Sequence, residues 1–294
     1  MRESWPSLTA MYVAFARALA TRDRVLVHAC DDPYAESLLP AALKPLLDRI
    51  GSSAHGEQLG KTLQALTLGL SHHLALRTAL IDRALSHAVE GGIEQVVLVG
   101  AGLDARAHRM SSLSGAAVFE VDHPATQRFK QQRAVSLPVA ARSIRYVACD
   151  FVRTPLAEAL QGARFRTSER SVWVWEGVTM YLPREAVARS LASIASASAD
   201  ESMLIATYLT PDIVAAGFGL GKLASGMLAL LSEPIRFAVA PEAFAQLLCE
   251  HGLELLSDTS PKDAAPHFGI ELGRLAPMLP AERLAVAIKR GEHS

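Results

Sequence analysis

Cysteine is scarce in this chain. The three that occur, Cys30, Cys149 and Cys249, are far apart and form no C-x-x-C pair. Zinc centres and redox pairs need closely spaced thiols, so the sequence predicts no metal site of that kind. The pattern is typical of a cytoplasmic protein that keeps its thiols reduced.

The chain also lacks an excess of either charge. It has 29 basic and 30 acidic residues, a formal net charge of −1, and its basic residues are spread along the sequence. Binding to nucleic acid depends on a concentrated positive surface. The composition therefore implies no polyanionic partner, and it leaves the oligomeric state open.

Long uninterrupted apolar runs are missing as well. Residues 213–231 form the longest apolar stretch, but Lys222 and four glycines interrupt it, so we expect no membrane-spanning helix. The first residues show no apolar core of a signal peptide, and we expect a cytoplasmic location. With 294 residues, 50% of them hydrophobic, the chain can bury a full core.

What the sequence does contain is an alternation of strand and helix patterns. Apolar residues recur every three or four positions within 8–90, which predicts helices. From residue 95 onward, short β-branched runs alternate with helical segments, which predicts a mostly parallel sheet. We expect seven strands, at 95–99, 116–121, 143–148, 171–175, 202–209, 252–256 and 267–275.

The most informative segment is 95–106, QVVLVGAGLDAR. A buried strand pattern ends in Gly100-Ala101-Gly102, and the two glycines allow a ligand to approach the backbone closely. Asp122 ends the next strand, about twenty residues later, which is where a doubly wound sheet places a carboxylate on ribose hydroxyls. The spacing predicts a cofactor that contains adenosine.

The glycine turn alone fits binders of NAD and FAD too. Asp104, inside the turn, would repel a pyrophosphate at the helix N-terminus. S-adenosylmethionine (SAM) has no phosphate and carries a sulfonium and an ammonium. Asp150 and Glu176 end two further strands, at the sheet edge where ligands bind. We therefore favour SAM; the alternatives are an NAD-dependent oxidoreductase and a SAM-binding regulatory protein without catalysis.

Four segments resemble the motif series of the leucine carboxyl methyltransferase family: VGAGLDARAHRM, FEVDHPATQRFK, ACDF and WEGVTMYLP. The N-terminal helical segments are similar as well, and the likeness runs from about Leu8 to residue 255. The resemblance implies a Rossmann-like, class I SAM-methyltransferase fold. It implies a helical cap at 1–90 and a core at 91–294 with a lid-like insertion around 211–240. It also implies O-methylation of a small molecule, with S-adenosylhomocysteine as product.

The acidic strand ends are the candidates for the adenosine part of the cofactor. Asp122 is our first choice for the ribose, because a carboxylate can accept two hydrogen bonds. We expect Glu120 to face the opposite side of the strand, where it is either a cofactor ligand or an indirect support. Asp150, followed by Phe151, either meets the adenine amine or caps the next helix. The full cofactor-binding prediction is Arg17, Arg77, Gly100, Ala101, Gly102, Asp104, Arg106, Glu120, Asp122, Asp150, Phe151, Glu176 and Gly177.

Three basic residues have two interpretations each. Arg77 lies in an apolar helical segment, where it either extends its charge to solvent or binds the SAM carboxylate through two parallel hydrogen bonds. The R-T-x-x-I-D pattern of the family favours the second. Arg17 corresponds to a position that is basic in the first helix of the family, which implies a cofactor contact. The alternative is an ordinary arginine on a helix surface. Arg106 and Asp104 either form a local pair that shapes the turn, or Asp104 instead helps to bind the SAM ammonium.

The acceptor end is predicted around Glu176, Gly177 and Tyr181, with Glu176 and Tyr181 as catalytic residues. In the family, the tyrosine of E-G-x-x-x-Y lies near the acceptor carboxylate. Arg153 stands one position later than the arginine of the family's Asp-Leu-Arg triplet, which leaves its role open.

The same end of the sequence offers no obvious general base. The three histidines considered, His108, His123 and His267, are expected to be structural or exposed. A carboxylate acceptor is ionised at neutral pH and needs no base, so we favour it over a phenol. The stretch 213–231 is either a mobile apolar cover or an ordinary packed helix pair.

Overall fold

The computed structural model describes residues 7–51, 69–151, 154–212, 234–273 and 281–291, with residues 56, 58–60, 62 and 279. Arg153 and the apolar stretch 213–231 lie outside the described residues, and so does most of the lid-like insertion predicted around 211–240.

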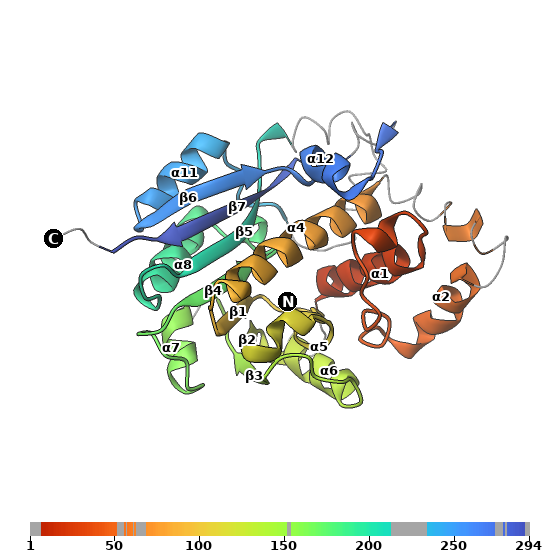
Figure 1. Cartoon of the computed structure of the whole chain (residues 1–294), viewed down its shortest axis with the longest axis horizontal. Helices are drawn as coiled ribbons and strands as arrows, with labels where there is room; N and C mark the ends of the chain where they lie inside the picture. Colours follow the sequence, from red (N-terminus) through yellow and green to blue (C-terminus); the bar gives the residue numbers. More distant parts are fainter. Residues whose placement is uncertain are drawn as a thin grey trace.

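A seven-stranded sheet with the order β3-β2-β1-β4-β5-β7-β6 forms the centre of the molecule (Figure 1). The first five strands run parallel, and β7 is antiparallel to both β5 and β6. The strands are β1 (Gln95–Val99), β2 (Ala117–Asp122), β3 (Ser143–Ala148), β4 (Ser171–Trp175), β5 (Met203–Leu209), β6 (Leu253–Thr259) and β7 (Glu282–Lys289). This confirms the predicted α/β class with its mostly parallel sheet.

The strand order reverses between β1 and β4. The connections that leave these two neighbouring strands run in opposite directions along the sheet, and a crevice opens at their carboxyl ends. The glycine turn after β1 and the Glu176-Gly177 turn after β4 flank this crevice. The topology therefore brings together two segments that are more than seventy residues apart in the sequence.

Helices cover both faces of the sheet (Figure 1). One face packs against α4, and the other against α7, α8 and α11. No helix within the described part of the chain has the length and apolarity needed to cross a membrane. The helices are α1 (Leu8–Arg22), α2 (Lys44–Gly51), α4 (Leu70–Glu90), α5 (Arg106–Arg109), α6 (Pro124–Ala134), α7 (Leu156–Gln161), α8 (Arg184–Ser196), α11 (Pro241–Cys249) and α12 (Pro261–Ala264).

The strand predicted at 267–275 is wrong. A 3-10 turn occupies Ala265–Phe268, and it ends at Gly269, whose φ of +67° is incompatible with a continuing strand. The seventh strand is β7, at Glu282–Lys289. Its alanines have little β-propensity, but it pairs with β5 on one side and β6 on the other. Tertiary pairing outweighs propensity here.

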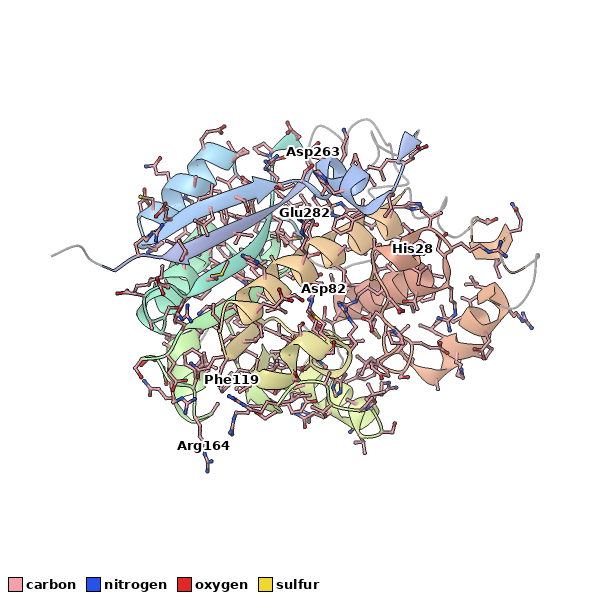
Figure 2. The ribbon with its side chains drawn as sticks, in the orientation of Figure 1. His28, Asp82, Phe119, Arg164, Asp263 and Glu282 are labelled. Carbon is pink, nitrogen blue, oxygen red and sulfur yellow. The ribbon has the colours of Figure 1, made fainter. Side chains whose placement is uncertain are left out.

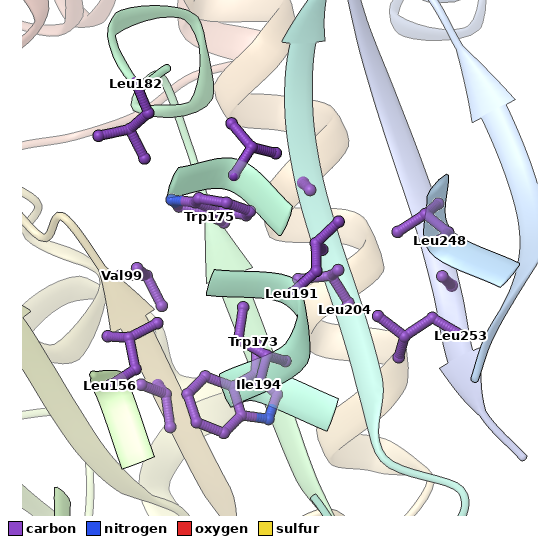
Figure 3. Packing of buried hydrophobic residues seen from close by; sticks show 14 of the residues in the cluster. Val99, Leu156, Trp173, Trp175, Leu182, Leu191, Ile194, Leu204, Leu248 and Leu253 are labelled. Atoms are coloured by element: carbon purple, nitrogen blue, oxygen red, sulfur yellow. The ribbon is translucent and has the colours of Figure 1, made fainter. Parts of the chain in front are cut away.

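The larger core cluster lies between the sheet and α8 (Figure 3). Trp173 and Trp175 point from β4 into this layer and are 0% and 1% exposed. The indole N–H of Trp173 donates to Ser171 Oγ (3.0 Å) and Ser198 Oγ (2.9 Å), so this buried polar group is satisfied. The layer fixes β4, and with it the turn that carries Glu176.

Two leucines of β6 provide a test of this packing. Leu253 is 2% exposed and belongs to the same core cluster, whereas Leu256 on the same strand is 49% exposed. Leu253→Ala should lower the free energy of unfolding by about 2–5 kcal/mol, because it leaves a cavity. Leu256→Ala should change it by no more than about 0.5 kcal/mol. Urea unfolding measures both, and equal losses would contradict the packing described here.

Candidate functional site

A cavity of about 420 Å³ opens at the carboxyl ends of β1 to β4. Residues from α1, α4 and the turns after these strands line it. Twelve of the predicted residues are among them: Arg17, Arg77, Gly100, Ala101, Gly102, Asp104, Asp122, Asp150, Phe151, Glu176, Gly177 and Tyr181. Glu120 and Arg106 are fully buried and do not line the cavity.

Glycine is required at two turns of the cavity wall. Gly100 has a φ of +72°, and a Cβ at this position would overlap the side chain of Val178. Gly177 has a φ of +66°, and a Cβ there would stand 3.6 Å from both Nη atoms of Arg77. Because position 177 carries no side chain, the Arg77 guanidinium remains accessible from the cavity.

The prediction that Asp122 and Glu120 face opposite sides of β2 is wrong, because residues two apart on a strand share a face. Only Asp122, at the end of the strand, lines the cavity. The backbone N–H groups of Gly102 and His123 donate to the two carboxylate oxygens of Asp122, which faces the cavity. Burial raises the pKa of Asp122 despite these bonds. Glu120 instead pairs with the buried Lys130 ammonium, and burial raises its pKa as well. Of the two acids, only Asp122 can reach a ligand in the cavity.

Arg77 does not extend to solvent. Its side chain, from α4, is buried between two carboxylates. Nε and Nη2 lie 3.0 and 2.9 Å from Oε1 of Glu176, and Nη1 lies 3.1 Å from both carboxylate oxygens of Glu282. Arg77 is therefore a cation that the fold itself compensates.

Arg106 joins the same network from the other side. Its guanidinium is fully buried and donates to Asp82 Oδ1 (2.6 Å), Glu176 Oε2 (2.7 Å) and the carboxylate of Asp104. The backbone N–H of Arg106 also donates to Asp104 Oδ1 (2.7 Å). The local pairing of Asp104 with Arg106 is thus present, and Asp104 still forms part of the cavity wall.

The acids of this network remain ionised at neutral pH. Burial alone would raise the pKa of Glu176, but Arg106 and Arg77 hold it well below its usual range. The same opposition lowers the pKa of Asp104, with Arg106 as the main compensating cation. The cavity floor therefore presents a positive guanidinium directly beside negative carboxylates. That arrangement can bind a zwitterion.

Arg17 holds the loop after β1. Its Nη2 donates to the backbone oxygen of Leu103 (3.1 Å), and its Nε lies 3.6 Å from Asp32. Asp150, Phe151 and Tyr181 line the cavity from the turns after β3 and β4.

The three histidines take different places. His123 lines the cavity and caps α6, because its Nδ1 accepts from the N–H of Ala125 (3.3 Å). His108 Nδ1 lies 2.8 Å from the backbone oxygen of Pro138, and burial lowers the pKa of this histidine. His267 lies in the 3-10 turn before Gly269 and does not line the cavity.

Sequence reasoning missed Glu282 and Arg236. Glu282 begins β7, the strand that was placed wrongly, and its burial at 2% exposure could not be foreseen. The sequence contains one hint, an acid at the start of an apolar run. A buried glutamate nearly always has a partner, but this hint does not identify which residue the partner is. Arg236 lines the cavity, and its backbone N–H donates to the carbonyl of Met180 (2.7 Å), next to Tyr181.

Comparison with known proteins gives concordant results. A model of the family described as leucine carboxyl methyltransferase matches residues 10–195. A relative from Mycobacteroides abscessus, named "Putative S-adenosyl-L-methionine-dependent methyltransferase", is 31% identical over 258 residues, which covers 85% of this chain and 84% of the relative. A second relative, also named as a putative S-adenosyl-L-methionine-dependent methyltransferase, comes from Mycolicibacterium smegmatis. It is 37% identical over 217 residues, which covers 72% of this chain and 70% of the relative.

One solved structure shows the same fold at low sequence identity. A DUF574 family protein from Streptomyces avermitilis matches with a TM-score of 0.59 at 19% identity, covering 84% of this chain and 97% of that one.

The ionisation of Glu282 predicts how stability depends on acid. Burial would raise its pKa, but Arg77 and His73 lower it from 4.5 to about 2. The carboxylate therefore contributes stability above pH 4.5 that is lost as the pH falls through about 2. Glu282→Gln removes this titration. As the pH falls through that interval, the free energy of unfolding of the variant should therefore fall less steeply than that of the wild type, by up to about 1.4 kcal/mol per pH unit. Urea unfolding from about pH 3 to about pH 7 checks this; parallel profiles would contradict it.

Proposed function

This chain belongs to the leucine carboxyl methyltransferase family and is a SAM-dependent methyltransferase, and from that premise we propose that it methylates an oxygen of a small, largely apolar acceptor. A carboxylate is the favoured acceptor. The observation that carries the SAM site of this proposal is the pairing in the cavity floor, where the Arg77 guanidinium lies against Glu176. The methionine part of SAM is a zwitterion, and this pairing is complementary to it.

The other residues of the cavity fit the rest of SAM. Asp122 would hold the ribose hydroxyls, since its oxygens face the cavity while backbone N–H groups fix them in place. Asp150 would accept from the adenine amine. Arg77 would bind the carboxylate, and Glu176 or Asp104 the ammonium. When bound, SAM supplies a methyl group already activated by its sulfonium.

Arg106 would act indirectly. It is buried behind the cavity wall and donates to both Glu176 and Asp104. A cation in that place keeps both carboxylates ionised and fixes their orientation. We propose the same kind of support for Glu120, whose pairing with Lys130 anchors α6 against β2.

The residues near Tyr181 favour an acceptor that is already ionised. Burial raises the pKa of the Cys149 thiol to about 11, so it is a poor base at neutral pH. Within the described lining, His123 is the only histidine; it follows Asp122, the proposed ribose ligand, and caps α6. A phenol acceptor, with a pKa near 10, would require a base, whereas a carboxylate would not. The protein would then act by aligning the acceptor and excluding water.

The acceptor is tested by the chemistry of its product. The assay uses labelled SAM with a panel of hydrophobic carboxylic acids, each compared with a phenol of similar shape. The carboxylic acids should be methylated, and the product should be a methyl ester that releases methanol in mild base. The rate should be flat from about pH 6 to about pH 9, because the carboxylate pKa lies near 4. Tyr181→Phe should lower the rate about fivefold, the value of one hydrogen bond, and leave S-adenosylhomocysteine affinity unchanged.

Tyr146→Phe is the matched control, because Tyr146 lies on β3 and does not line the cavity. A methylated product that survives base, or a rate that climbs toward the pKa of the phenol, would overturn the carboxylate. Tight binding of S-adenosylhomocysteine without transfer to any acceptor in the panel would favour a regulatory protein.

A further inference from the structure

Two carboxylates hold the Arg77 guanidinium from different sides. The Nε and Nη2 atoms face Glu176, and Nη1 faces Glu282. An ideal Cβ at Gly177 would be equally far, 3.6 Å, from Nη1 and Nη2. The glycine thus leaves both Nη atoms accessible from the cavity, while the acids prevent the group from turning.

Glu282 is itself held in place by its neighbours. Its carboxylate is buried where β7 faces α4 (Figure 2). His73 Nε2 lies 2.5 Å from Oε2, and the Thr207 side chain hydrogen-bonds to the same carboxylate. His73 precedes Arg77 by four residues, so one helix face presents both groups to Glu282.

Thr207 connects Glu282 to the turn after β4. Its Oγ1 accepts from the backbone N–H of Gly177 at 2.9 Å. Gly177 directly follows Glu176, so a short path of hydrogen bonds runs from one acid of the Arg77 site to the other. The side chains that hold Arg77 therefore form one connected frame across α4, β5, β7 and the β4 turn.

We infer that Glu282, held by His73, is a positioning residue that fixes the Arg77 guanidinium for the carboxylate of SAM. The inference rests on the proposed role of Arg77. A guanidinium already fixed in its binding orientation loses less conformational entropy when the ligand arrives. Glu282 also prevents Arg77 from being an unpaired buried cation before binding. It lies outside residues 10–195, so the C-terminal strand contributes to the cofactor site.

Two variants separate the geometry of Glu282 from its charge. Glu282→Asp keeps the charge but withdraws the carboxylate by one methylene, so it cannot reach Nη1 and His73 together. Glu282→Gln removes the charge but keeps an oxygen in reach of Nη1. The ligands are SAM and decarboxylated SAM, which lacks only the carboxylate. Calorimetric titration gives the preference for SAM, defined as the ratio of the two dissociation constants.

The wild type should prefer SAM by at least about tenfold, which corresponds to 1.4 kcal/mol. In Glu282→Asp the preference should fall below about threefold, with the affinity for decarboxylated SAM unchanged within about twofold. Glu282→Gln should keep the wild-type preference. Glu254→Asp is the matched control, because Glu254, on the neighbouring strand β6, is exposed and pairs with the exposed Arg290.

The inference is overturned if Glu282→Asp keeps the wild-type preference, if it loses affinity for both ligands equally, or if Glu282→Gln loses as much preference as Glu282→Asp. Should Glu282→Asp fail to fold, His73→Leu removes the second support of the carboxylate and should lower the preference in the same direction; an unchanged preference there overturns the inference. A wild type without preference would instead refute the proposed role of Arg77 itself.

Discussion

Compensation of buried charge is the constraint on which this site depends. Arg77 and Arg106 are almost inaccessible to solvent, and Glu176 lies between them, with one carboxylate oxygen on each. Removing such groups from water costs several kcal/mol per ion, and the cost is offset only when every charge finds a close partner. The network is thus weak evidence for stability and stronger evidence for a task that needs fixed charges at the cavity floor.

The topology of the sheet supplies the partners. Glu176 follows β4, Asp104 lies in the turn after β1, and Glu282 begins β7. These segments are distant in the sequence, and they meet because the strand order reverses between β1 and β4 and because β7 inserts beside β5. The same edge of the sheet carries Asp122. One sheet edge therefore serves both the adenosine end and the methionine end of the proposed ligand.

Local signals predicted much of this arrangement. The glycine turn and Asp122 could be identified because spacing along β1 and β2 determines where they lie. Asp122 and Glu120 share a face of β2, so the strand pattern could not separate them. Only the structure showed Glu120 paired with Lys130 and Asp122 at the cavity. Glu282 could not be identified, because its partners come from α4 and β5, and no local pattern encodes a pairing across two hundred residues.

Titration of S-adenosylhomocysteine into Arg77 variants tests the central claim most directly, namely that the buried network presents this guanidinium to SAM. Arg77→Ala should weaken binding by roughly 2–5 kcal/mol, and Arg77→Lys should recover only part, because an ammonium cannot form two parallel hydrogen bonds. Arg189→Ala, on the exposed surface of α8, should match the wild type. A folded Arg77→Ala protein that binds within about twofold of wild type, a difference of less than about 0.5 kcal/mol, would contradict the account.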